Sequence, residues 1–239
     1  MKNEIELYGD GIGKVQYIQH MGTDATVVQS ARVSFGVEAN EELNARDKKL
    51  INYLISHKHT STLEHNVITF KFTVPLFIRS QHHRHRTWSY NEISRRYTDK
   101  DLMFYEPVGF RTQHKSNRQA SNPDDISNPM LETYNPMSPK PFSILASDRV
   151  KQHHKNSLAL FDDLLEAGVC REQARGVLPQ NLYTEYYGTV CCSNLLKFVE
   201  LRIHEGAQYE IQKVAMACLE IAEHLWPVTI GAYRKHREI

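Results

Sequence analysis

The chain has 239 residues, 41% of them hydrophobic, and a formal net charge of +1 at pH 7. This charge argues against a general polyanion binder, and no apolar run is long enough for a membrane span. The N-terminal residues, Met1-Lys2-Asn3-Glu4, do not resemble a signal peptide. We therefore expect a soluble, cytoplasmic protein with one core and a single domain over residues 1–239, without a nucleic-acid or membrane partner.

The first half of the chain predicts one helix and one strand. Residues 41–57 carry leucine and isoleucine at helical spacing, which is typical of an amphipathic helix. Residues 65–78 alternate polar and apolar side chains as a strand does, and Pro75 is expected to interrupt or bend that strand.

The second half begins with a segment that lacks periodicity. Residues 107–146 are rich in Ser, Asn and Pro, which predicts an irregular insertion that is either a lid or disordered. A helix is expected from Ser147, a good N-cap, to Gly168, a good stop, and a last helix at about 207–225. Residues 183–190 fit a strand or a helix. Together the elements predict the α+β class, with a mainly antiparallel sheet and packed helices.

Cysteine and histidine give no metal or disulfide pattern. The four cysteines form no CxxC pair, so we expect buried, reduced thiols; they are Cys170, Cys191, Cys192 and Cys218. Residues 82–85 read His-His-Arg-His, but adjacent histidines on an extended chain diverge, so no metal site is predicted.

Residues 84–97, Arg-His-Arg-Thr-Trp-Ser-Tyr-Asn-Glu-Ile-Ser-Arg-Arg-Tyr, are the most informative segment. Buried charges need partners, so this is no ordinary core strand, and guanidinium forks match phosphates and planar acceptors. If residues 77–86 are extended, the Arg-His-Arg side chains alternate between two faces and could serve two ligands. Ser89–Glu92 reads as a turn, because Ser and Asn bond their own backbone. The composition favours an anionic, nucleotide-like ligand.

The pattern Arg-His-Arg-x-x-Ser-x-Asn-Glu-x-Ser-x-Arg-Tyr resembles the signature of the flavin-dependent thymidylate synthases, with every fixed position present. The resemblance covers most of the chain except roughly 107–146. It extends to residues 26–36, His59–His65, Arg175–Pro179, Asn181–Thr184, Leu201-Arg202 and Ala207-Gln208.

This resemblance implies an enzyme that is a methyltransferase and an oxidoreductase in one. Such an enzyme makes dTMP from dUMP by reductive methylation. It takes carbon from 5,10-methylenetetrahydrofolate and uses FAD as redox carrier and NADPH as reductant. The family also implies a homotetramer in which active sites are shared between subunits.

The resemblance assigns residues to the flavin. Arg84-His85-Arg86 would hold the FAD pyrophosphate by charge-assisted hydrogen bonds. The full cofactor-binding set that it implies is Ser34, His59, Ser61, Arg84, His85, Arg86, Glu92, Cys191, Ser193 and Lys197.

The resemblance also assigns residues to the activation and binding of the substrate. Uracil C5 is a poor nucleophile, and a guanidinium near N3 and O2 would stabilise an enolate-like uracil and push electron density to C5. By resemblance that catalytic role falls to Arg202, which from sequence alone would more often be a structural ion pair. The implied dUMP-binding set is Gln81, Arg84, Glu92, Ser94, Arg95, Arg96, Arg175 and Arg202.

Some positions depart from the family pattern. Cys191 and Lys197 stand where many members carry Asn, and His204 and Gly206 stand where Asp and His often follow the activating arginine. The resemblance therefore does not carry over the individual flavin contacts at these positions, and we hypothesise that Lys197 replaces a hydrogen bond with a charge contact to the FAD phosphates.

Two alternatives stay open. The basic, aromatic run could be the stacking and phosphate surface of a nucleic-acid-binding module. The chain could also be a catalytically silent flavoprotein that has lost turnover through the changes near Cys191 and Gly206.

Overall fold

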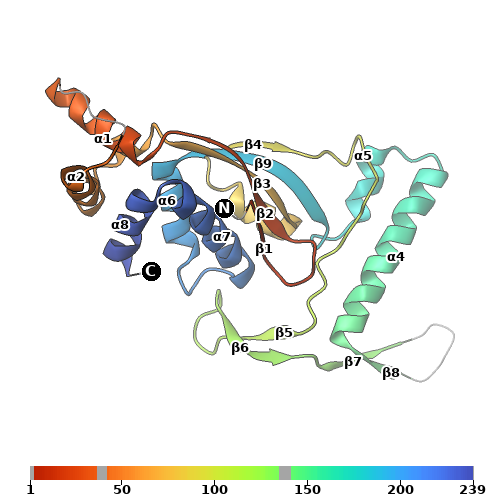
Figure 1. The fold of residues 1–239 in the computed structure, drawn as a ribbon. Coiled ribbons are helices and arrows are strands. Elements are labelled where there is room, and N and C mark those ends of the chain that lie inside the picture. Colours follow the sequence, from red (N-terminus) through yellow and green to blue (C-terminus); the bar gives the residue numbers. More distant parts are fainter. Residues whose placement is uncertain (1–2, 37–41, 135–140, 239) are drawn as a thin grey trace. The chain divides into compact units, whose positions relative to one another are not determined.

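Figure 1 shows the fold in the computed structural model, which describes residues 3–36, 42–134 and 141–238. The chain forms two compact units. The first comprises Met1–Thr73, Ser80–Glu92 and Glu185–Ile239, and the second comprises Val74–Arg79 and Ile93–Thr184. The single-domain organisation stays a prediction.

A five-stranded sheet forms most of the framework of the first unit, in the order β1-β2-β3-β9-β4. Strand β1 pairs antiparallel with β2, β2 with β3, and β4 with β9. The α+β class with a mainly antiparallel sheet is therefore confirmed. The strands are β1 (Glu4–Glu6), β2 (Lys14–Met21), β3 (Val67–Pro75), β4 (Ser89–Glu92) and β9 (Tyr183–Cys191).

Helices pack beside this sheet in the first unit. Helix α2 packs against α8, and α7 packs against α6, α8 and β2. The α7 core stripe of Ile211, Val214, Cys218 and Ile221 has helical spacing and is fully or almost fully buried. The helices of this unit are α1 (Asp24–Arg32), α2 (Ala45–Ser56), α6 (Cys192–Arg202), α7 (Tyr209–Leu225) and α8 (Pro227–Arg237).

The helices expected at 41–57 and 207–225 are confirmed as α2 and α7, with residue 41 outside the described residues. Helices α1, α6 and α8 were not predicted. Helix α6 buries Leu195, Leu196, Phe198 and Val199, so it has little of the amphipathic periodicity by which a helix is found.

Asp24 ties helix α8 to the start of α1. Its carboxylate is 5% exposed and accepts hydrogen bonds from the amides of Val228 and Thr229, both at 2.9 Å, and from the Thr229 hydroxyl at 2.6 Å. First-turn amides of a helix have no intrahelical partner, and a carboxylate there also complements the helix dipole. The side chains that α8 carries are thereby held in place.

Aromatic rings fill the core below residues 82–90. Trp88 is 5% exposed and lies 4.5 Å, centroid to centroid, from the fully buried ring of His82. A Cβ atom at position 188 would approach the Phe72 ring to 2.8 Å and the Trp88 ring to 3.2 Å, so glycine is required there. The rings therefore fix how closely β9 approaches the 82–90 segment.

The segment around this core differs from its sequence prediction in two places. Strand β3 ends at Pro75 as expected, but the chain then forms helix α3 (Leu76–His82) and a turn, so the extended conformation for 77–86 is wrong. Ser89–Glu92 is strand β4 rather than a turn. Its four residues pair with Tyr186–Thr189 of β9, and this long-range ladder overrides the local turn preference of Ser and Asn.

The second unit contains short strands where the sequence predicted no regular structure. Two antiparallel pairs form, β5 (Phe110–Gln113) with β6 (Ser121–Ser127) and β7 (Met130–Thr133) with β8 (Phe142–Leu145). Because most of their residues are exposed, these strands lack the polar–apolar alternation that marks a half-buried strand. A lid function for 107–146 stays a prediction.

The helix expected from Ser147 is confirmed as α4 (Ala146–Glu166), followed by the short α5 (Arg171–Ala174). Ser147 is not its N-cap, which is Leu145; the Ser147 amide donates instead to Asn128 Oδ1 at 3.0 Å. Gly168 follows the helix with φ +84°, a left-handed conformation suited to glycine. The alternative left open for 183–190 is settled as strand β9.

Candidate active site

The Arg-His-Arg triplet lies in a turn between α3 and β4 that one tyrosine fixes. The Tyr90 hydroxyl lies 2.9 Å from the carbonyl oxygen of His82 and 3.1 Å from that of His85, and donates to both. The His85 amide closes the turn by donating to the His82 carbonyl at 2.9 Å. The position of the His85 ring is thus set by a half-buried side chain on the neighbouring strand.

Arg202, the last residue of α6, binds this turn through neutral acceptors. Its Nε donates to His85 Nε2 at 3.0 Å and its Nη2 to the Gln81 carbonyl at 3.3 Å. Among the described residues, no carboxylate forms an ion pair with Arg202. The ion pair that the sequence favoured for Arg202 is therefore absent from the described part of the chain, and the charge of its guanidinium stays uncompensated there.

The hydrogen bond from Arg202 requires a neutral His85. Burial, and then the nearby Arg202 charge, lower the pKa of His85 to about 4. At neutral pH His85 therefore carries its single ring proton on Nδ1, which leaves Nε2 free to accept. Burial and the Arg84 charge in turn lower the pKa of Arg202.

A chain of amides continues from Gln81 into the core. Gln81 Nε2 donates to Gln208 Oε1, and Gln208 Nε2 donates to Glu210 Oε2 at 2.9 Å. Glu210 is 3% exposed and lies in the first turn of α7. We call Gln81, His85, Arg202, Gln208 and Glu210 the Arg202 network.

The other members of the motif in the first unit differ in exposure. Arg84 and Arg86 are exposed, and Glu92 is half-buried in β4. Arg84 is close enough to Arg202 to affect its pKa, so two guanidiniums lie near each other at this turn. Such a pair is suited to an anionic or electron-rich ligand.

Four expected substrate residues belong to the second unit, and the structure gives them local partners there. Arg95 donates to the Lys100 carbonyl at 2.7 Å, and Arg96 Nε lies 3.6 Å from Glu172 Oε2. Ser94 Oγ accepts from the Arg96 amide at 3.3 Å, and Arg175 is exposed. Their role in dUMP binding stays a prediction.

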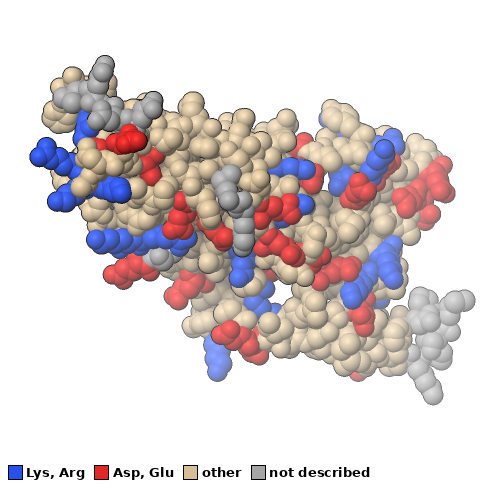
Figure 2. Space-filling view, in the orientation of Figure 1, with Lys and Arg blue, Asp and Glu red and all other residues tan. Residues whose placement is uncertain are grey.

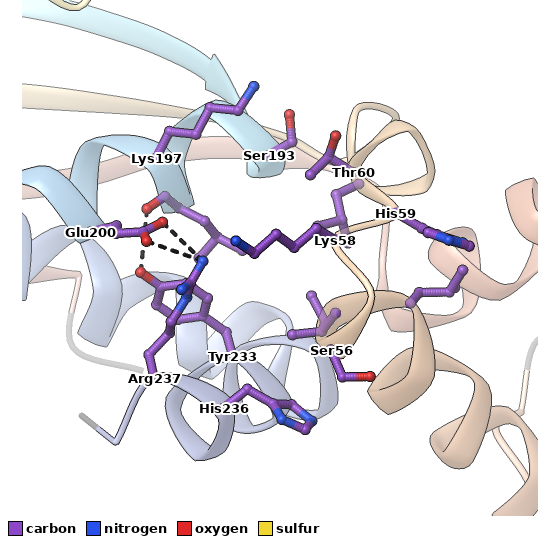
Figure 3. Close-up of a pocket in the computed structure, with 14 residues that line it drawn as sticks. Ser56, Lys58, His59, Thr60, Ser193, Lys197, Glu200, Tyr233, His236 and Arg237 are labelled. Atoms are coloured by element: carbon purple, nitrogen blue, oxygen red, sulfur yellow. Dashed lines mark hydrogen bonds and ion pairs between the residues drawn. The ribbon is translucent and has the colours of Figure 1, made fainter.

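Three of the expected flavin residues line one cavity of about 410 Å³ in the first unit: His59, Ser193 and Lys197. The cavity lies among α2, α6 and α8 (Figure 3). Its other lining residues are Leu54, Ile55, Ser56, Lys58, Thr60, Leu63, Leu196, Glu200, Tyr233, His236 and Arg237. We call this cavity the cationic pocket.

The remaining expected flavin residues do not line that pocket. Ser34 and Ser61 are exposed in short 3-10 helices, Val33–Phe35 and Thr60–Leu63. Cys191 is half-buried, and its sulfur accepts from Asn194 Nδ2 at 3.2 Å.

The two buried cysteines are unsuited to act as nucleophiles. All four thiols are free; Cys192 and Cys218 are buried as expected, whereas Cys170 is exposed, contrary to the expectation. Burial raises the pKa of both the Cys192 and the Cys218 thiols, which disfavours a thiolate. Within the described ranges, no three His, Cys, Asp or Glu side chains gather as a metal site would need.

Sequence reasoning missed several residues of these sites. Tyr90 looked only like an aromatic residue available for burial, and Gln208 entered only as part of a resemblance. Lys58 gave no signal, because nothing in its local pattern shows that it faces α8 residues nearly 180 positions later.

Comparison with known proteins places the chain among enzymes of nucleotide metabolism. Residues 16–228 match the family model described as thymidylate synthase complementing protein. Flavin-dependent thymidylate synthases from Thermus thermophilus and Thermotoga neapolitana are 38% and 36% identical to this chain over 224 residues. These alignments cover 94% of this chain in both cases and 76% and 92% of the relatives.

A solved structure resembles the fold over nearly its whole length. The UMP/dUMP methylase PolB from Streptomyces cacaoi, bound with 5-Br dUMP, matches with a TM-score of 0.78 and 30% identity, covering 97% of both chains. No helix in the described part of this chain is long and apolar enough to span a membrane.

Proposed function

The chain belongs to the family of flavin-dependent thymidylate synthases, and from this we propose that it methylates dUMP reductively to dTMP. A flavin is the cofactor that membership implies. We further propose that the flavin is FAD, that 5,10-methylenetetrahydrofolate donates the carbon, and that NADPH supplies the electrons. With the uptake of one proton, the products are dTMP, tetrahydrofolate and NADP⁺, which balances the reaction.

The observation that carries the proposal is the orientation of Arg202. Two of its N–H groups are held by His85 and the Gln81 carbonyl, while the remaining N–H groups and the full positive charge stay available. A guanidinium fixed in this way can donate to a planar acceptor such as uracil O2. It would stabilise the negative charge that develops on the uracil ring as C5 becomes nucleophilic.

The described residues favour this electrostatic activation over covalent activation by either buried cysteine. The buried Cys192 and Cys218 thiols have raised pKa values. A thiolate at either position is therefore disfavoured, whereas Arg202 needs no deprotonation to act.

The donor set of the cationic pocket fits a phosphate-bearing flavin. His59, Ser193 and Lys197 supply an imidazole, a hydroxyl and an ammonium to one cavity. When bound, the flavin would supply the hydride that completes reduction of the transferred carbon. The residues of this chain would hold the cofactor and orient the uracil.

A homotetramer is part of the proposal. Val33 and Phe35, on either side of the expected flavin residue Ser34, are 73% and 83% exposed. Two large apolar side chains beside a predicted ligand residue favour a subunit contact there. Light scattering coupled to size-exclusion chromatography should give four times the chain mass of 27.7 kDa.

A general nucleic-acid-binding module is not favoured. On the face in Figure 2, Lys and Arg side chains are interspersed with Asp and Glu side chains. Such a mixture lacks the continuous positive field that a nucleic-acid surface requires.

Anaerobic absorbance spectroscopy tests the proposal. The purified chain is mixed with FAD and NADPH, with and without dUMP, and the flavin band is followed. We expect bleaching whose rate or extent changes with dUMP, and dTMP once methylenetetrahydrofolate is added. Flavin that stays unbound or indifferent to dUMP would refute the proposal, and bound flavin without dTMP would identify a silent flavoprotein.

A further inference from the structure

The buried carboxylate of Glu210 fixes the polarity of two side-chain amides in the Arg202 network. A carboxylate only accepts hydrogen bonds, so Gln208 turns its NH2 group toward Glu210 Oε2, which lies 2.9 Å from Gln208 Nε2. The oxygen of the same amide, Gln208 Oε1, then accepts from Gln81 Nε2. Oxygen and nitrogen thus have fixed places in both amides, and we call Glu210, Gln208 and Gln81 the amide relay.

The inner end of the amide relay is held firmly by the start of α7. Glu210 is 3% exposed and lies in the first turn of that helix, where the helix dipole favours a negative charge. The Tyr8 hydroxyl donates to the Glu210 carbonyl at 3.3 Å, and Gln212 Nε2 donates to the Ala207 carbonyl at 2.8 Å. The carboxylate therefore stays in place, and the polarity that it sets is passed outward to the half-buried Gln81.

At its outer end the relay leaves Gln81 with an acceptor to offer. Because Gln81 Nε2 is bonded to Gln208, the oxygen Gln81 Oε1 lies on the other side of the amide group. Of the described residues, none donates a hydrogen bond to that oxygen. The main-chain carbonyl of the same residue accepts from Arg202 Nη2 at 3.3 Å. One residue thus orients the guanidinium and also carries a side-chain acceptor of fixed polarity.

An acceptor of fixed polarity distinguishes uracil from cytosine. The uracil edge has one donor, N3–H, between the acceptors O2 and O4, and O2 is the atom to which Arg202 is proposed to donate. In cytosine N3 is itself an acceptor, and the exocyclic amine is the donor. An amide oxygen that meets N3 is therefore paired by uracil and left unpaired by cytosine, and sites built to bond a substrate N–H reject analogues that lack it.

We propose that Glu210, acting through Gln208, is a positioning residue that makes Gln81 Oε1 the acceptor for uracil N3–H and so selects uracil over cytosine nucleotides. This inference rests on the proposed function, in which dUMP lies against Arg202. Glu210 contributes the direction of the Gln81 amide, while Gln81 makes the contact with the base.

Glu210→Gln tests the relay with a side chain of nearly the same shape. An amide at position 210 permits either polarity of Gln208, so Gln81 no longer presents its oxygen in every molecule. Calorimetry with the full chain and saturating FAD gives the dissociation constants of dUMP and dCMP. The wild type should prefer dUMP, and this preference should shrink about ten-fold in the variant, the effect of one hydrogen bond. Gln208→Leu cuts the relay at its half-buried middle link and should shrink the preference in the same way.

Exchanging the two inner side chains of the relay restores its polarity. With Gln208→Glu and Glu210→Gln combined, the carboxylate at position 208 accepts from the amides at 81 and 210, so Gln81 keeps its original direction. The preference for dUMP should return to the wild-type value, which a purely structural role of Glu210 does not predict. Glu223→Gln removes another carboxylate from α7, one paired with Arg234 at 2.9 Å, and should leave both dissociation constants unchanged.

A third nucleotide separates the two donors that the nucleoside of dUMP offers. 2′,3′-Dideoxyuridylate keeps N3–H and lacks the 3′-hydroxyl, so Glu210→Gln should weaken its binding as much as that of dUMP. A loss seen with dUMP alone would give Gln81 Oε1 to the ribose and overturn the inference. An unchanged preference in both Glu210→Gln and Gln208→Leu would also overturn it, while the proposed function stands. A wild type that binds no dUMP would overturn the proposed function and the inference together.

Discussion

The Arg202 network and the cationic pocket are both built on helix α6, yet they treat positive charge in opposite ways. Arg202 ends the helix with its guanidinium held by neutral acceptors, while Ser193, Lys197 and Glu200 of the same helix line the pocket. In the network His85 and the Gln81 carbonyl fix the direction of one cation. In the pocket the ammonium groups of Lys58 and Lys197 form no ion pair with a carboxylate of the described residues. The first arrangement suits a planar group that must be oriented, and the second suits an anion that must be neutralised.

The largest expected effect comes from removing the oriented cation. Arg202→Gln keeps hydrogen-bonding capacity but loses the charge, so dTMP formation should fall roughly 100- to 1,000-fold. Flavin affinity should change little, because Arg202 does not line the pocket. Arg149→Gln, at an exposed position on α4, is the matched control. Turnover equal to that of the control would show that Arg202 has no part in the chemistry.

His85→Ala tests whether orientation matters apart from charge. Without the Nε2 acceptor the guanidinium stays charged but loses its direction, so kcat should fall about ten-fold or more. His85→Gln places an amide oxygen within reach of Arg202 Nε and should recover much of the lost kcat. If alanine and glutamine behave alike, the imidazole acts through some other contact, such as the cofactor contact that the resemblance assigns to it.

The pKa of His85 offers a direct measure of the same contact. An NMR titration of the wild type should place it at about 4, and Arg202→Gln should raise it while burial keeps it below 6.5. Between these pH values the unfolded chain binds more protons than the folded one. The stabilisation from neutral His85 is therefore complete above pH 6.5 and is lost as the pH falls toward 4. A wild-type pKa near 6.5 would contradict the buried, arginine-bonded ring.

Tyr90→Phe has the smallest expected effect, because it loosens the turn and leaves the Arg202 contacts formed. Loss of the shared hydroxyl bond should lower the free energy of unfolding by about 1 kcal/mol in urea denaturation. Tyr97→Phe, whose ring is 81% exposed, should be neutral. A neutral Tyr90→Phe would mean that the turn keeps its shape through its backbone bonds alone.

For these two regions, side-chain types in the sequence were more informative than local backbone patterns. Periodicity was sufficient for α2 and α7, because each buries one stripe of residues, but it missed α6, which is buried on most sides. The turn predicted after the Arg-His-Arg triplet was wrong, because the pairing of β4 with β9, about 97 residues away, determines the backbone conformation there. The motif still pointed to the residues that meet at Arg202, since side-chain types were informative where backbone conformation was not.

For the cationic pocket, the sequence could not show which residues from distant segments lie together. The family resemblance singled out His59, Ser193 and Lys197, and these three residues line one cavity. It said nothing of Lys58 or Arg237, because a single sequence does not show which helix faces which. Contacts between α2 and α8 join residues far apart in the chain, and those contacts create the pocket wall.

The placement of the tryptophans gives this protein a built-in optical probe. The chain has only two, Trp88 beneath the turn that carries His85 and Trp226 at the start of α8, and both are almost completely buried. Trp226 donates to the Gly22 carbonyl at 3.0 Å, far along the chain from that turn. A Trp226→Phe variant would leave Trp88 as the sole indole emitter. Its emission would then follow the turn as dUMP or a flavin arrives, without any added dye.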